Sequence, residues 1–94
     1  MGLDFCWLGE QKQPPRVTLN DRDIEAVLRA FEKLKDRTGV FVDPYADTRI
    51  APEQAKVLIV EIEKTKADSD GIRRLLNLLD EAVKSSEWII AVGD

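Results

Sequence analysis

The chain has 94 residues, of which 44% are apolar and 34% are charged, and its formal net charge is −4. This size supports one globular domain over residues 1–94, and the acidic balance argues against a nucleic-acid partner, because phosphate contacts require a basic face. The chain contains no histidine, which excludes Ser-His-Asp and Cys-His nucleophile pairs and imidazole-bearing zinc sites.

The first predicted element is a strand over residues 3–7. Leu3, Phe5 and Trp7 alternate with Asp4 and Cys6, the period-2 pattern of a strand with one buried face. As the single cysteine, Cys6 cannot form an internal disulfide, and no basic segment followed by a long apolar run opens the chain, so we expect a cytoplasmic protein. No basic group neighbours Cys6, which predicts a small packing residue. An exposed loop with a double proline follows over 10–16.

A helix is predicted over residues 21–37. Asn20 is a suitable N-cap, acidic residues occupy the first turn and Gly39 follows the last one, as helix termini favour. Five apolar residues recur at helical spacing and are predicted to form one buried stripe. They are Ile24, Val27, Leu28, Phe31 and Leu34.

Residues 40–42 predict a short strand that stops at Asp43-Pro44. A second helix is expected to begin at Pro52, which is pre-organised for the first helical position. The β-branched residues within 55–62 also fit a strand, and we favour the helix because of the Pro-Glu-Gln start and the lysine-rich end. The apolar run over 57–60 is far shorter than the ~20 residues that span a bilayer, so no membrane partner is expected.

A third helix is predicted from a cap at Ser69 or Asp70 to Ser85-Ser86, followed by a buried strand over 88–92. The order β-α-β-α-α-β predicts an α+β fold in which a sheet of about three strands, including both termini, packs against about three helices. The two tryptophan-bearing terminal strands are expected to meet and to pack on the same core.

The segment from Asp43 to Arg49 is the strongest candidate site. Asp43 before Pro44 starts turns, because its carboxylate can accept an amide hydrogen two residues on. One reading is therefore a tight double turn and nothing more. In the functional reading, Tyr45 projects from this rigid turn as a partner-binding anchor surrounded by Asp43, Asp47 and Arg49. Two carboxylates four residues apart fall short of a calcium-loop pattern, so no metal site is expected.

No catalytic residues or cofactors are expected. The acidic pairs lie on predicted exposed helix faces, where pKa values stay ordinary. These pairs are Asp21/Asp23, Glu61/Glu63 and Asp80/Glu81. The glycines form no phosphate-binding loop.

The run Asp43-Pro44-Tyr45-Ala46-Asp47-Thr48, followed by Ala51-Pro52-Glu53-Gln54, resembles a segment of small, mostly uncharacterised bacterial single-domain proteins. Some of these are similar to immunity proteins that neutralise a toxin. The aspartate-rich helix and Tyr-Pro pattern of the colicin nuclease immunity family are missing, so a nuclease target is not implied. The resemblance implies binding rather than catalysis.

The sequence therefore predicts a non-catalytic module that occludes a protein partner, a toxin if it is immunity-like. One alternative is a small-ligand-binding or enzymatic domain that uses Asp43, Tyr45 and Asp47. Another is a structural module that forms a homodimer by pairing its terminal strands.

Overall fold

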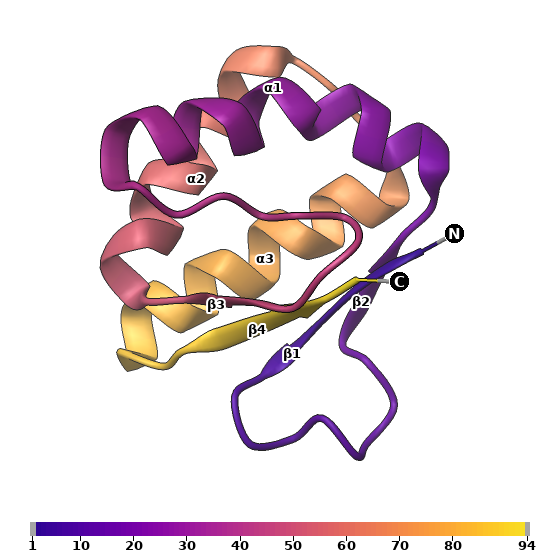
Figure 1. Cartoon of the computed structure of the whole chain (residues 1–94), viewed down its shortest axis with the longest axis vertical. Helices are drawn as coiled ribbons and strands as arrows, with labels where there is room; N and C mark the ends of the chain where they lie inside the picture. Colours follow the sequence, from indigo (N-terminus) through magenta and orange to yellow (C-terminus); the bar gives the residue numbers. More distant parts are fainter. Residues whose placement is uncertain (1, 94) are drawn as a thin grey trace.

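Strands from the two ends of the chain pair in the middle of one sheet. The computed structural model describes residues 2–93. Strand β1 (Leu3–Trp7) runs antiparallel to β4 (Ile89–Val92), with Asp4 opposite Val92. Strand β2 (Val17–Leu19) pairs with the free side of β1 and β3 (Thr48–Ile50) with the free side of β4, which gives the order β2-β1-β4-β3 (Figure 1). The predicted meeting of the terminal strands is confirmed.

The predicted α+β class is confirmed, but the sheet of the described residues has four strands. Residues 40–42 do not form the predicted strand, although Val42 is fully buried in the core. The strand of this region is β3, and β2 was not predicted. Both are three residues long, and such short strands are defined by the partner they pair with rather than by their own residue pattern.

The three helices begin and end where local signals placed them. Helix α1 (Asp21–Thr38) starts with a capping box between Asn20 and Asp23 and ends at Gly39, whose φ of 85° only glycine adopts readily. Helix α2 (Pro52–Thr65) settles the assignment of 55–62 as helical. Helix α3 (Asp70–Ser85) is capped by Ser69, whose Oγ accepts the N–H of Ile72 at 3.1 Å. None of the helices in the described part of the chain is both long and apolar enough to cross a bilayer.

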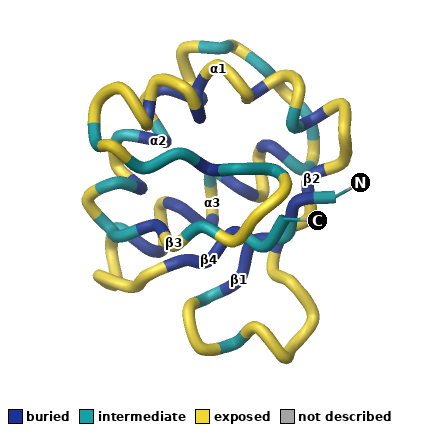
Figure 2. Tube along the Cα trace, viewed as in Figure 1, coloured by how far each residue is buried: buried dark blue, intermediate teal, exposed yellow. Residues whose placement is uncertain are grey.

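The helices cover one face of the sheet, and the core lies between the two layers (Figures 1 and 2). Alternate strand residues point into it, as the period-2 pattern requires. The inward set is Leu3, Phe5, Val17, Leu19, Ile50, Ile89 and Ala91. Asp4, Cys6 and Ile90 alternate with that set and belong to the outer face, where Cys6 and Ile90 are nevertheless buried among their neighbours.

Two burial predictions are wrong in part. In the α1 stripe, Val27, Phe31 and Leu34 are buried, whereas Ile24 is only half-buried and the Leu28 side chain is 36% exposed. Ile24 and Leu28 lie at one margin of the stripe, beyond the surface that the sheet and other helices cover. Trp88 is 45% exposed, because it lies just before β4 and alternates with Ile89, which points into the core.

Asp23 joins the N-termini of α1 and α3. Ser69 Oγ donates to Asp23 Oδ1 at 2.7 Å, and Asp23 is only 6% exposed. A Cβ atom on Gly71 would lie 2.6 Å from Asp23 Oδ2, so the close approach requires glycine here. Asp23 is therefore not on the exposed face predicted for it.

Candidate functional site

The segment from Asp43 to Ala46 forms the first of the two predicted turns, whereas the second does not form because Thr48 begins strand β3. The Tyr45 N–H donates to Asp43 Oδ1 at 2.9 Å, and the Ala46 N–H donates to the Asp43 carbonyl at 3.2 Å. The side chain of Asp43 thus satisfies the backbone of the turn. Tyr45 lies within this turn, so its backbone is held at the point from which its side chain projects.

Two further contacts hold the turn in place. Thr48 Oγ1 donates to the carbonyl of Phe41 at 3.3 Å, which ties the two sides of the loop together. Gly93, just after β4, donates its N–H to the Ala46 carbonyl at 3.1 Å. A Cβ atom on Gly93 would lie 2.5 Å from the Pro44 carbonyl oxygen. The turn is therefore packed directly on the backbone of the central sheet.

Tyr45 is 67% exposed, more than any other large hydrophobic residue in the described part of the chain. Its backbone is fixed by the turn while its ring faces solvent. A rigid base and a free aromatic side chain are the properties of an interface anchor, because little conformational entropy is lost when the ring is buried by a partner.

A groove of about 450 Å³ lies beside Tyr45, between the N-terminal half of α1 and residues 41–45. Figure 1 shows the connection after α1 folding back along that helix before it reaches β3. We call this hollow the Tyr45 groove. Its apolar lining consists of Ile24, Leu28, Phe41, Pro44 and the Tyr45 ring. Phe41 is further held by Lys35, whose Nζ lies 5.8 Å from the ring centroid, a cation–π distance.

Three carboxylates also line the Tyr45 groove. They belong to Asp21 and Glu25 at the start of α1 and to Asp43 in the turn. An apolar surface bordered by acidic groups favours an apolar ligand group that is flanked by positive charge.

The structure brings together only part of the predicted site. Asp43 and Tyr45 line the same groove, whereas Asp47 and Arg49 are exposed and are not part of its lining. Arg49 lies opposite Ile90 in the sheet register, on the outer face.

Ile24, Leu28 and Phe41 also line the groove, although the sequence pattern predicts Ile24 and Leu28 in the core and Phe41 in a strand. The spacing of four between Ile24 and Leu28 was the available signal, since it places both at one margin of the apolar stripe.

Two observations concern reactive groups outside the Tyr45 groove. Burial raises the pKa of the Cys6 thiol, which keeps it protonated and unreactive near neutral pH. Among residues 2–93, no three histidine, cysteine, aspartate or glutamate side chains are grouped closely enough to hold a metal ion.

Comparison with known proteins adds no family assignment. No protein-family model matches the sequence, and no significant similarity is found to a curated protein or to a solved structure.

Proposed function

We propose that this protein is a non-catalytic binding module that occludes a protein partner through the Tyr45 groove. The observation that carries the proposal is the exposed Tyr45 ring on a rigid turn beside apolar residues that the core leaves uncovered. The resemblance of residues 43–54 to immunity-like proteins favours a toxin as the partner.

The partner surface that fits is an apolar side chain flanked by lysine or arginine. The apolar group would fill the space between Leu28, Phe41 and Tyr45, while the basic groups face the carboxylates of Asp21, Glu25 and Asp43. Asp47 and Arg49 lie outside the groove and are proposed as peripheral contacts, which contribute less because rim charges stay solvated.

Self-assembly through the terminal strands is less well supported. Both β1 and β4 are central in the sheet and already have a neighbour on each side. A second copy would have to pair with the edge strands β2 or β3, which are only three residues long.

The test is a pull-down of the partner protein with wild-type protein and Tyr45→Ala, followed by isothermal titration of the captured partner against both. We expect Tyr45→Ala to weaken binding by about 2 kcal/mol or more, because aromatic anchors carry a large share of interface energy. Thermal melts of both proteins should agree, since the ring is exposed. Asp43→Ala should instead lower the melting temperature, because it removes the acceptor for the Tyr45 N–H.

Two leucines provide a matched control. Leu28 is 36% exposed and lines the groove, whereas Leu8 is 38% exposed and lies in the turn after β1. Leu28→Ser should reduce affinity and Leu8→Ser should not. Equal affinity of wild type and a normally folded Tyr45→Ala would contradict the proposal. The interface would then be sought on the exposed face of α3, around Arg73, Arg74, Asp80 and Glu81.

A further inference from the structure

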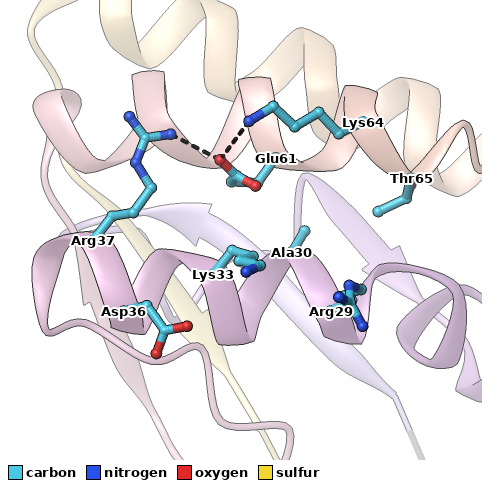
Figure 3. A pocket seen from close by; sticks show the side chains of 8 residues that line it. All are labelled: Arg29, Ala30, Lys33, Asp36, Arg37, Glu61, Lys64 and Thr65. Carbon is cyan, nitrogen blue, oxygen red and sulfur yellow. Dashed lines mark hydrogen bonds and ion pairs between the residues drawn. The ribbon is translucent and has the colours of Figure 1, made fainter.

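A second hollow, of about 500 Å³, lies between the C-terminal half of α1 and the end of α2. Figure 3 shows the side chains that line it. Four of them are cationic, namely Arg29, Lys33 and Arg37 from α1 and Lys64 from α2. We call it the α1–α2 pocket. It shares no lining residue with the Tyr45 groove.

Glu61 fixes two of these cations in the wall of the pocket. Its carboxylate is 6% exposed, and Oε2 accepts from Arg37 Nη1 at 2.7 Å and from Lys64 Nζ at 3.3 Å (Figure 3). The hydrogen bond from Arg37 is the main cause that lowers the pKa of Glu61, ahead of the opposing effect of burial. Glu61 is therefore an anion that orients Arg37 and Lys64, which corrects its predicted place on an exposed face.

Arg29 and Lys33 lack such a partner. Neither side chain has a hydrogen bond or an ion pair with any other residue in the range 2–93. With Arg37 they form a row at i, i+4 and i+8 on α1, and like charges at this spacing repel one another. With Asp36 as the second carboxylate in the lining, the pocket keeps a net positive charge in a chain whose net charge is −4.

We infer that the α1–α2 pocket binds the phosphoryl group of a small molecule. A phosphate dianion would relieve the repulsion along α1 and offer several acceptor oxygens to the guanidinium and ammonium donors. The space of about 500 Å³ is ample for a phosphoryl group with a small organic substituent. A nucleic-acid strand fits poorly, because the chain has a net charge of −4 and its cations outside this pocket are interleaved with acidic residues.

The test is a titration of ¹⁵N-labelled protein with inorganic phosphate at constant ionic strength, with chloride as the reference anion. Saturable shifts of backbone amides are expected within residues 29–37 and 61–65, and not in residues 41–47. The double variant Arg29→Gln/Lys33→Gln should bind phosphate at least about tenfold more weakly, because it removes the two unpaired cations.

The matched control is Lys12→Gln/Arg22→Gln, which removes two exposed cations outside the pocket and should retain the wild-type affinity. Equal losses in both double variants would mean that phosphate responds only to net charge, and would overturn the inference. Chloride shifts of the same size at the same amides would overturn it too.

A parallel arm uses phosphatidylcholine vesicles with and without phosphatidic acid. Binding of free phosphate without vesicle binding supports a small-molecule ligand. Binding to the acidic vesicles without any response to free phosphate would assign the pocket to a lipid headgroup and overturn the inference.

Discussion

Helix α1 borders both the Tyr45 groove and the α1–α2 pocket, and the linings of the two carry opposite net charge. On one flank of its buried stripe, Ile24 and Leu28 meet a loop in a groove that also contains carboxylates. On the other flank, Arg29 and Lys33 face α2 across a pocket with a positive lining. The difference follows from what each flank packs against. The loop satisfies its own backbone and presents Phe41 and apolar neighbours, whereas α2 presents the buried anion Glu61.

The comparison shows that the two flanks of one amphipathic helix can carry linings of opposite charge. Its central stripe builds the core, while the residues just outside that stripe are free to differ on the two sides. Changes in the stripe should affect both grooves, and changes beyond it should affect one.

The largest effect is expected for Phe31→Ala, because Phe31 is fully buried in the stripe between the two grooves. Its removal should cost about 3–5 kcal/mol of unfolding free energy, a large share of the stability of a small domain. Urea denaturation measures this loss. Partner and phosphate binding should weaken together as the folded fraction falls. A denaturation midpoint close to that of wild type would contradict the burial of Phe31.

Gly93→Ala should change the Tyr45 groove and leave the α1–α2 pocket as it is. The added Cβ would approach the Pro44 carbonyl oxygen and the Ala46 backbone within 2.7 Å, so the turn that carries Tyr45 must move. We expect destabilisation of about 1–3 kcal/mol, as for overpacking in general. Amide shifts should change over residues 41–47 and stay constant over 61–65. A spectrum that is unchanged around Tyr45 would show that the turn is not packed on Gly93.

Glu61→Gln should change the α1–α2 pocket, on the opposite flank of α1. The folded pKa of Glu61 is lowered, so the unfolded chain binds the proton more readily and the ionised carboxylate stabilises the fold. This contribution is fully present above the ordinary pKa of 4.5 and is lost as the pH falls through the lower folded value. The stability deficit of Glu61→Gln should therefore be seen at pH 7 and shrink in acid. A deficit that is independent of pH would show that the pairing with Arg37 and Lys64 is not electrostatic.

Cys6 lies outside both grooves and should give the smallest effect. Burial raises its pKa, so a thiol reagent should label the native protein slowly at pH 7 and rapidly after denaturation. Cys6→Ser should change stability only and leave both binding activities intact. Rapid labelling of native protein at pH 6 would contradict this.

The helices could be predicted from the sequence because each carries its own boundaries, such as Asn20 and Gly39 around α1. The edge strands could not. Residues 40–42 have the apolar, β-branched character of a strand, and yet β3 forms at 48–50, where Ile50 meets Ile89. Local residue preference does not determine which segment reaches the side of a central strand.

The candidate site could likewise be predicted only in part, namely in its local turn and not in its groove. The turn at Asp43 follows from local chemistry, and Tyr45 projects from it as expected. The groove depends on which margin of the α1 stripe remains uncovered, and that is decided by how α1 docks on the sheet. The sequence pattern treats Leu28 and Phe31 alike, whereas tertiary packing buries only Phe31.

The pairing of β1 with β4 also constrains how the chain folds. Asp4 and Val92 are register partners, so the centre of the sheet cannot form until residues 89–92 are available. The helices contain only local contacts and can form early, whereas closing the sheet requires a loop of nearly the whole chain, which slows folding. Before that step the apolar faces of the helices are not yet covered by the sheet. The protein should therefore fold in one late, cooperative step. It is most prone to aggregation in the period before that step, while apolar side chains are still exposed.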